Sequence, residues 1–427
     1  MICSAHCRAS SVFLSGLLLA TCPNLATASL VVKVSKAVSV LSPVAVPSFG
    51  SGPTAQPSLA QVVRYDLSNS GYFRVLPPGL YPGDPHDARR LALTSWEDIG
   101  AQTLVFGSIL HRPGSYTVSA YLVNLLDPSA YSGERFIANR YAFHRIGNQI
   151  ANLAYRHVTH HEGPFSGHLA FVDQLGQNYD LEVSGCEGWD PRVVVRGKIP
   201  IISPAWSPGD HHLAYVSYRH QHSVIYIQNL QTGHRVLLPG HGYALSAPAY
   251  SPNGHYLAFA RAKHGRTQIA VENLRTGRVQ MLASIGTVNT SPVWSPDGRH
   301  IFFVSNRDGS AQIFRMDRSG TNVHRVTWSG GYNVSPAISP NGKWLAFVHA
   351  DNGILSVAIM HQDGTGLRVL YSATNCERPS FAPDSRMVLF NTTRGGRKVL
   401  GQVAINGRGL HFLHIPGQTK EGSWDYI

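Results

Sequence analysis

The second half of the chain repeats a pattern in which polar turn residues precede a short apolar run. One copy reads Ser-Pro-Val-Trp-Ser-Pro-Asp-Gly at 291–298, and the apolar run Ile-Phe-Phe-Val follows at 301–304. A period near 44 residues, with short strands and a turn in every unit, predicts propeller blades of four antiparallel strands. The position of the second serine recurs every 44 residues, with a last step of 43, at Ser207, Ser251, Ser295, Ser339 and Ala382.

The turn chemistry agrees with this prediction. In Ser251-Pro252-Asn253-Gly254 the proline stands at the second turn position, where its fixed φ fits, and glycine stands where a left-handed residue is needed. We therefore expect a tight turn between the first and second strands of each blade. The proline of the leading Ser-Pro or Ala-Pro pair is expected at a strand start, where a missing N–H removes no ladder hydrogen bond.

The number of blades follows from the two ends of the repeat region. The apolar run 169–172 lies 44 residues before Leu213 but has no motif ahead of it, and Ser423-Trp424 lies 43 residues after Ser380-Phe381. We predict that the C-terminal strand completes the first blade and closes a six-bladed ring, which removes an open sheet edge. A solenoid is the alternative, but it would need capping repeats rather than a returning strand.

The residues before 160 follow a different pattern. Ser58 is placed to cap a helix in which Leu59, Val63 and Leu67 recur at helical spacing. Alternation of strands and helices predicts a mixed sheet with helices packed on it. The predicted fold is thus a small N-terminal α/β domain at 41–160 followed by an all-β propeller at 163–427. Strands are expected at 43–47, 72–76, 103–110 and 116–125, and helices at 59–67, 90–96 and 146–157.

The first residues have the features of a secretory signal peptide at 1–28. Arg8 is followed by an apolar stretch too short to span a membrane and by the cleavage-type sequence Ala26-Thr27-Ala28. A lipoprotein would instead be acylated at Cys22, but Thr21 is larger than the residue expected before such a cysteine. No later stretch is long enough to span a membrane, so we expect a soluble exported protein.

Residues 29–40 begin apolar and then alternate with polar positions. Such a segment can form an edge strand of the next domain, or remain flexible and add to the sheet of a partner protein.

The remaining cysteines and a histidine cluster give little evidence of chemistry. Cys186 and Cys376 are expected on opposite faces of the propeller, too far apart for a disulfide, as two unpaired thiols. His157, His160 and His161 could face a metal, but histidine is also favoured at a helix C-terminus, and no Glu or Cys completes a known site. We expect no metal and no cofactor.

The net charge of +12 leaves three classes of partner open, namely nucleic acid, anionic surfaces and acidic proteins. Export argues against nucleic acid, and the aromatic residue of each motif is expected in inter-blade packing. For an enzyme, the chain lacks G-x-S-x-G, H-E-x-x-H and P-loop sequences, and Asp297 and Asp384 are explained by hairpin turns. The motif aromatics are Trp206, Tyr250, Trp294, Phe381 and Trp424.

A signal peptide, an α/β domain and six blades with Ser-Pro-x-Trp-Ser-Pro motifs resemble the TolB family, periplasmic components of the Tol-Pal system. The resemblance implies a monomeric scaffold that binds the lipoprotein Pal through the propeller and TolA through its N-terminal segment. It also implies a role in outer-membrane integrity and cell division, and binding of bacteriocins. An exported propeller enzyme or a carbohydrate-binding protein is the alternative.

The resemblance also implies site residues. The Pal-facing surface would be formed by loops just ahead of each motif, with Ala247 and Thr290 near its centre, and Leu30, Val32 and Val34 would engage TolA. Lys36, Ala244, Cys376 and the missing proline at Gly422 depart from the family pattern. The loops are 201–203, 243–247, 288–291, 332–335 and 375–378, with contacts at Ser203, Ala244, Ala247, Asn289, Thr290, Asn333 and Glu377.

Loops between second and third strands should share this face, and they are rich in cations. We hypothesise a neutral contact centre ringed by basic side chains that speed association with an acidic partner. The alternative is that these charges are simply solvated. The cations are Arg219, Arg261, Lys263, Arg266, Arg307, Arg394, Arg397 and Lys398, against the carboxylates Asp173, Asp308 and Asp351.

Overall fold

The α/β part of the chain is built on a five-stranded mixed sheet. The computed structural model describes residues 40–50, 58–86, 91–139, 141–283 and 285–425. Strand order is β2-β1-β3-β4-β5, with β1 parallel to β2 and β3 and the remaining pairs antiparallel. The predicted mixed sheet is therefore confirmed. Its strands are β1 (Ser42–Ala45), β2 (Phe73–Val75), β3 (Thr103–Arg112), β4 (Ser115–Asn124) and β5 (Asp127–Ala138).

Three α-helices and a short 3₁₀ helix accompany this sheet. α1 (Leu59–Asn69) begins as predicted at Ser58, whose hydroxyl accepts from the Gln61 backbone N–H while the Gln61 side chain accepts from that of Ser58. The other helices are η1 (Pro78–Leu80), α2 (Leu93–Asp98) and α3 (Phe143–Thr159). Strand β5 was not predicted from the sequence, because its apolar positions are few and Pro128 lies within it.

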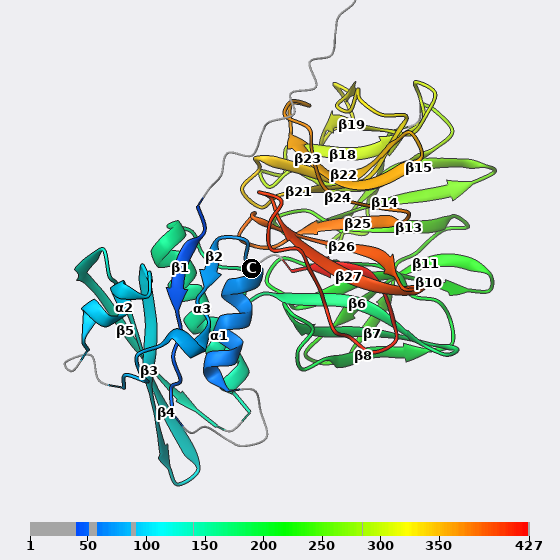
Figure 1. The fold of residues 1–427 in the computed structure, drawn as a ribbon. Coiled ribbons are helices and arrows are strands. Elements are labelled where there is room, and N and C mark those ends of the chain that lie inside the picture. Colours follow the sequence, from blue (N-terminus) through cyan, green and yellow to red (C-terminus); the bar gives the residue numbers. More distant parts are fainter. Residues whose placement is uncertain (1–39, 51–57, 87–90, 140, 284, 426–427) are drawn as a thin grey trace, which may run out of the picture. The chain divides into compact units, whose positions relative to one another are not determined.

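Six four-stranded antiparallel sheets follow, so the predicted six-bladed propeller is confirmed (Figure 1). Each motif provides the first strand of a blade and the turn that leads into the second strand. The blades, from first to fourth strand, are β29 (Gln418–Trp424), β6 (His168–Leu175), β7 (Asn178–Gly185), β8 (Arg192–Gly197); β9 (Ile202–Trp206), β10 (His212–Arg219), β11 (His222–Asn229), β12 (Arg235–Leu237); β13 (Ala244–Tyr250), β14 (Tyr256–Lys263), β15 (Arg266–Asn273), β16 (Val279–Ala283); β17 (Asn289–Trp294), β18 (His300–Ser305), β19 (Gln312–Asp317), β20 (His324–Arg325); β21 (Tyr332–Ile338), β22 (Trp344–Asp351), β23 (Ile354–His361), β24 (Arg368–Ala373); and β25 (Cys376–Phe381), β26 (Met387–Arg394), β27 (Arg397–Ala404), β28 (His411–Phe412).

The ring is closed by the C-terminal strand. β29 pairs antiparallel with β6, and the register sets Ser423 opposite Ala170 and Trp424 opposite Leu169. In Figure 1 the red C-terminal segment accordingly belongs to the same sheet as the green β6. The prediction that the tail completes the first blade is confirmed.

The motif tryptophans join neighbouring blades. The indole N–H of Trp206 donates to the Ser423 carbonyl of the preceding blade at 3.2 Å, and that of Trp294 donates to the Ala249 carbonyl at the same distance. Both rings are buried. Trp206 and Trp294 therefore each supply apolar area and a hydrogen bond across a blade boundary, as expected for a buried indole.

Cys186 and Cys376 are both buried and unpaired, as predicted. Cys186 follows the third strand of its blade, whereas Cys376 begins a first strand, so the two thiols lie at opposite ends of their strands. Burial raises the pKa of both thiols, which keeps them protonated and unreactive at neutral pH.

Helix α3 contacts the propeller through buried polar groups. The Tyr155 hydroxyl of α3 donates to Asp384 at 3.2 Å, and just after α1 the Gly71 carbonyl accepts from the Asn406 side chain at 3.0 Å. The Nε2 atom of His144 lies 3.4 Å from a Glu187 oxygen, with both side chains buried. Burial raises the pKa of Glu187 to about 8 and lowers that of His144 to about 4. At pH 7 this pair is therefore neutral.

In the described part of the chain, none of the helices combines the length and apolarity required to cross a bilayer.

Replacing Trp424 should test how much the closing strand contributes to stability. Trp424 is 1% exposed, whereas Trp328 is 72% exposed. We expect Trp424→Ala to lower the free energy of unfolding by about 3–5 kcal/mol, and the control Trp328→Ala to change it by less than about 0.5 kcal/mol. Urea denaturation followed by fluorescence and circular dichroism measures both. Equal effects of the two substitutions would contradict the proposed contribution of the closing strand β29, which pairs with β6 at the seam of the ring.

The neutral Glu187 predicts a pH-dependent stability. The unfolded carboxyl has a pKa of 4.5, so between pH 4.5 and about 8 the folded state retains a proton that the unfolded state has lost. The contribution of Glu187 to the free energy of unfolding is therefore complete below pH 4.5 and is lost as the pH rises from 4.5 to about 8. His144 acts in the opposite sense between about pH 4 and 6.5, which leaves 6.5–8 as the window where Glu187 acts without it.

Across that window we expect the stability of the unsubstituted chain to fall by about 2 kcal/mol relative to Glu187→Gln, which cannot titrate. The control Glu162→Gln alters an exposed carboxylate and should leave the pH profile unchanged. Parallel profiles for the unsubstituted chain and Glu187→Gln, from urea melts at half-unit pH steps, would show that Glu187 is ionised in the folded state.

Candidate binding site at the propeller channel

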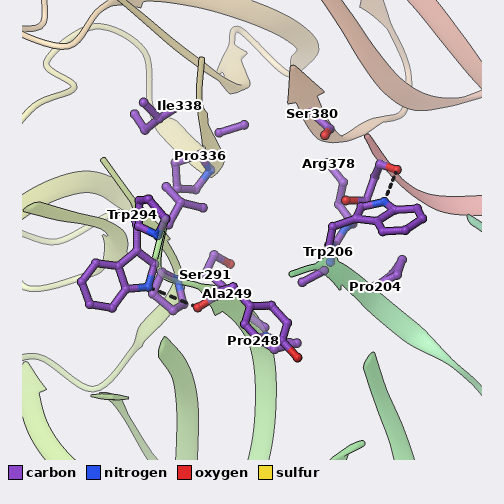
Figure 2. Close-up of a pocket in the computed structure, with 18 of the residues that line it drawn as sticks. Pro204, Trp206, Pro248, Ala249, Ser291, Trp294, Pro336, Ile338, Arg378 and Ser380 are labelled. Atoms are coloured by element: carbon purple, nitrogen blue, oxygen red, sulfur yellow. Dashed lines mark hydrogen bonds between the residues drawn. The ribbon is translucent and has the colours of Figure 1, made fainter. Parts of the chain in front are cut away.

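The first strands of the blades line a central cavity of about 350 Å³. Figure 2 shows Trp206 and Trp294 on different sides of it, with prolines from several blades between them. Its wall is mainly apolar, with proline, alanine, tryptophan and tyrosine side chains and small serines. Each of the five motif-bearing blades contributes its leading proline, namely Pro204, Pro248, Pro292, Pro336 and Pro379.

Each first strand is interrupted at the residue just before this proline. In five blades that residue has a positive φ, and in the sixth the equivalent Glu421 ahead of Gly422 has one; the six values are 47–58° although none of the residues is glycine. Such left-handed residues cost on the order of 1–3 kcal/mol each and persist only where the surrounding structure enforces them. They are Ser203, Ala247, Ser291, Ser335, Arg378 and Glu421.

The strand register shifts at the same place in every blade, as at a β-bulge. In β13, for example, the pairing with β14 is regular up to Ser246 and resumes at Ala249. The prediction that the segments just ahead of each motif are loops is therefore wrong in large part, because most of their residues belong to the first strands. The leading prolines are also not at strand starts; they stand at the bulge, where the ladder is already interrupted.

One polar network crosses the seam at the channel wall. Arg378 donates to the Ser203 hydroxyl at 2.7 Å and lies 3.0 Å from a Glu421 carboxylate oxygen, which also accepts from the Ser203 backbone N–H at 2.9 Å. The three residues come from β25, β9 and β29, which are consecutive first strands around the ring. Arg378 is the last residue of the predicted loop 375–378, whereas Glu421 was not predicted, although the 43-residue spacing that aligns Ser423 with Ser380 also aligns these two.

Two of the predicted contact residues are completely buried. Asn289 donates to the Ile285 and Thr267 carbonyls, and Asn333 donates to the Ser329 carbonyl and the Gln312 side chain. Both amides hold the chain just ahead of a first strand. Their side chains are therefore not available for direct contact with a partner in this conformation.

Four other predicted residues remain accessible in part. Ala244 and Thr290 are half-buried in β13 and β17, Ala247 lines the cavity, and Glu377 lies 3.6 Å from the Lys398 ammonium. Ser203 is buried and belongs to the seam network. The centre of the mouth thus presents small, mostly uncharged groups.

The predicted basic residues lie at the ends of the second strands or the starts of the third. Arg219 is exposed, Arg261 lies 3.8 Å from the Tyr243 ring centre, and Arg394 lies 4.2 Å from that of Phe412. Arg307 is half-buried and donates to Asn289, and burial lowers its pKa. Three of these guanidinium groups, those of Arg261, Arg307 and Arg394, are thus held in place by a ring or an amide beside them.

One of the three predicted acidic residues does not belong to this surface. Asp173 lies within β6 and is buried, with its pKa raised by burial and by Asp180. Its place in the predicted charge balance was wrong, because the strand extends further than the apolar run indicated. Asp308 and Asp351 are exposed, so the accessible charge is more positive than predicted.

The other candidate residues form no site here. Asp297 and Asp384 each accept backbone N–H bonds within their turns, as predicted. His157 and His160 lie at the end of α3, and His161 follows them. Among the residues that the structure describes, the group of side chains that could hold a metal ion lies elsewhere, at His168, Asp210 and Asp425. Leu30, Val32 and Val34 lie outside the described residues.

Fold and site together define a six-bladed β-propeller protein with a preceding α/β domain and a preformed, weakly charged channel mouth. The chain belongs to the TolB β-propeller family, whose propeller-domain model matches residues 155–427. A second model, the TolB amino-terminal domain, matches residues 30–129.

Individual relatives agree. The chain is 34% identical over 212 residues to the "Tol-Pal system protein TolB" of Bordetella parapertussis, covering 49% of this chain and 48% of the relative. It is 36% identical over 200 residues to the protein of that name from Methylobacillus flagellatus, covering 46% of each. The chain thus spans about half the length of the curated relatives it matches.

A solved structure extends the likeness. The crystal structure of TolB from Acinetobacter baumannii matches with a TM-score of 0.82 at 27% identity, over 91% of this chain and 98% of that one. The order of domains and the six-bladed ring are therefore shared across nearly the whole chain.

Proposed function

We propose that this protein is the periplasmic propeller component of a Tol-Pal system and that it is a scaffold for protein partners. In this role the channel mouth binds the peptidoglycan-associated lipoprotein Pal, and the segment containing Leu30, Val32 and Val34 binds TolA. The observation that carries the proposal is the preformed neutral mouth in a propeller of the TolB family.

The mouth has the properties of a protein-docking surface. The cavity that it adjoins has an apolar wall of prolines and aromatic rings, and the six bulges fix the backbone before a partner arrives. A surface that is already ordered loses little conformational entropy on binding. Small side chains such as Ala247 and Thr290 leave room for a partner's larger anchors.

The surrounding guanidinium groups give the partner its expected charge. Arg219, Arg261, Arg307 and Arg394 stand at the rim, where the described surface carries few carboxylates. Rim charges act mainly on the rate of association. We therefore propose an acidic docking surface on the partner, and the same surface is open to bacteriocins. Together with TolA at the N-terminal segment, these contacts would support outer-membrane integrity and constriction during division.

Affinity capture from detergent-solubilised envelopes tests both contacts at once. We expect the mature chain from Ser29 to retain Pal and TolA, and a chain that begins at Ala37 to retain Pal alone. Ala247→Glu adds bulk and negative charge at the mouth and should reduce Pal recovery at least tenfold while TolA remains. The control Gln231→Glu lies in an exposed turn between third and fourth strands, at the other end of a blade, and should bind like the unsubstituted chain.

Capture of neither partner by the chain from Ser29 would exclude the assignment. Loss of Pal with Gln231→Glu as well as with Ala247→Glu would place the contact away from the mouth.

Salt and charge substitutions test the steering by the basic rim. Arg219 and Arg266 are exposed on this face, whereas Arg275 is exposed in a turn on the opposite one. We expect the pair Arg219→Gln and Arg266→Gln to slow association with Pal by roughly 2–10-fold at low ionic strength, with little change in dissociation, because rim charges act before contact. Stopped-flow measurements at 20 and 150 mM salt follow both rates.

Screening should shrink this difference at the higher salt, since the Debye length is then about 8 Å. Arg275→Gln serves as the matched control and should leave both rates unchanged. An association rate that is independent of salt would refute steering while leaving the binding site intact.

A further inference from the structure

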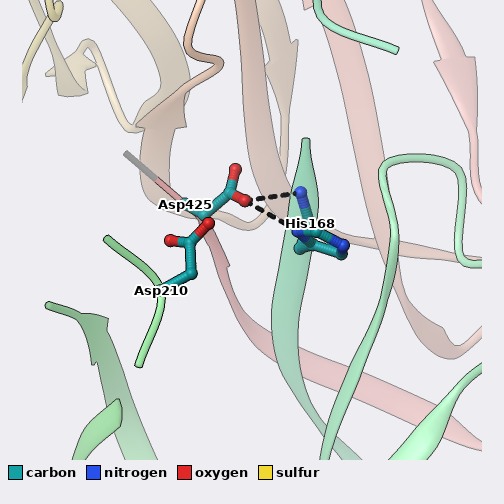
Figure 3. Close-up of side chains that lie close together, drawn as sticks. All are labelled: His168, Asp210 and Asp425. Atoms are coloured by element: carbon teal, nitrogen blue, oxygen red, sulfur yellow. Dashed lines mark hydrogen bonds and ion pairs between the residues drawn. The ribbon is translucent and has the colours of Figure 1, made fainter. Parts of the chain in front are cut away.

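A cluster of one histidine and two aspartates lies at the seam of the ring. His168 begins β6, Asp425 follows β29 directly, and Asp210 lies in the turn between β9 and β10. Their potential ligand atoms all lie within 4.8 Å of one another (Figure 3). The cluster therefore brings together the first two strands of the closing blade, β29 and β6, and a turn of the next blade.

Asp425 is buried with an unused oxygen. Its side chain has no exposed surface, and Oδ2 accepts from the His168 backbone N–H at 2.8 Å and from Nδ1 at 3.0 Å. Within the described residues its Oδ1 has no hydrogen-bond partner, and neither has Oδ1 of Asp210. In Figure 3 the Asp210 carboxylate points toward Asp425. Buried carboxylate oxygens without a donor are costly.

The same position in other blades shows which part of this arrangement is structural. Asp425 aligns with the serine that follows the motif aromatic, such as Ser207 and Ser251, whose hydroxyls accept the backbone N–H of His212 and Tyr256 at 3.0 Å. Asp425 accepts the equivalent N–H of His168 with one oxygen. A serine would satisfy that bond. The turn does not explain why Asp425 has a second buried oxygen, or why the His168 imidazole and the Asp210 carboxylate lie beside it.

The local charges are also unbalanced. The charged groups that act on His168 are Asp425 and Asp210, and those that act on Asp210 are Asp425 and His168. Two carboxylates thus face one imidazole, with no lysine or arginine among these described neighbours, so a further positive charge would be stabilised here.

We propose that His168, Asp210 and Asp425 form a binding site for a divalent transition-metal cation, with Zn²⁺ as the best match. Imidazole and carboxylate ligands suit Zn²⁺, whereas Ca²⁺ prefers oxygen ligands alone. The His168 side chain is 51% exposed, which leaves room for water to complete the coordination. A bound ion would tie the last strand to β6 of its own blade and to the turn between β9 and β10 of the next blade. This site is independent of any protein partner.

Titration calorimetry with Zn²⁺ on the full chain tests the proposal. Because the chain contains 22 histidines, weak surface binding must be separated from the seam site. We expect one tight equivalent of Zn²⁺, at least tenfold weaker Mn²⁺ binding and still weaker Ca²⁺ binding. A control that replaces His157, His160 and His161 by glutamine should keep the tight equivalent.

Asp425→Ser is the decisive variant, because it restores the residue of the other blades and keeps an acceptor for the His168 N–H. We expect it to fold without metal and to bind Zn²⁺ at the tight site at least tenfold more weakly than the unsubstituted chain. Asp210→Asn should weaken binding in the same direction with the seam unchanged. Zn²⁺ should raise the melting temperature of the unsubstituted chain and leave that of Asp425→Ser unchanged.

Tight binding that survives both Asp425→Ser and Asp210→Asn would overturn the proposal, and so would its loss in the triple histidine control. Absence of any tight equivalent in the unsubstituted chain would overturn it as well. The Co²⁺ form gives a second readout, since its visible absorption should change in Asp210→Asn even if Asp425→Ser fails to fold.

Discussion

The pairing of β29 with β6 is the constraint on which the rest of the propeller depends. Without it, β6 would be an unpaired edge strand, and the first blade would have three strands instead of four. Closure brings Trp424 against Leu169 and sets the Ser423 carbonyl beneath the Trp206 indole. The Arg378, Glu421 and Ser203 network then crosses the same boundary. Pairing, packing and ionic contacts are thus concentrated where the chain has no covalent continuity.

Closure also explains how the strained residues at the channel are maintained. Six non-glycine residues hold positive φ values, one per blade, and each strand on its own would relax toward an extended conformation. In the ring each bulge is fixed by the paired second strand on one side and by the neighbouring first strand on the other. The result is a mouth whose backbone is set before any partner binds, with neutral groups at the centre and cations at the rim.

The contact between the α/β domain and the propeller relies on buried polar groups as well as apolar packing. Tyr155 and Phe165 share an apolar core with Leu169 and Trp424, so helix α3 and the closing blade stabilise each other. Within this contact Asp384 receives the Tyr155 hydroxyl, and the neutral Glu187 and His144 lie side by side. Changes in protonation here would act on the seam through shared packing.

The sequence by itself determined the six blades, the closing role of Ser423-Trp424 and the mixed sheet, because periodicity and turn chemistry are local properties of the chain. It also placed the cations next to the turns between second and third strands, but it miscounted Asp173 as accessible, because the burial of that residue depends on how far β6 extends. Only the tertiary structure decided that the leading prolines stand at bulges, that Asn289 and Asn333 are buried, and that Arg378 meets Glu421 and His168 meets Asp425. These outcomes depend on contacts between residues far apart in the chain, which appear only once the ring has closed.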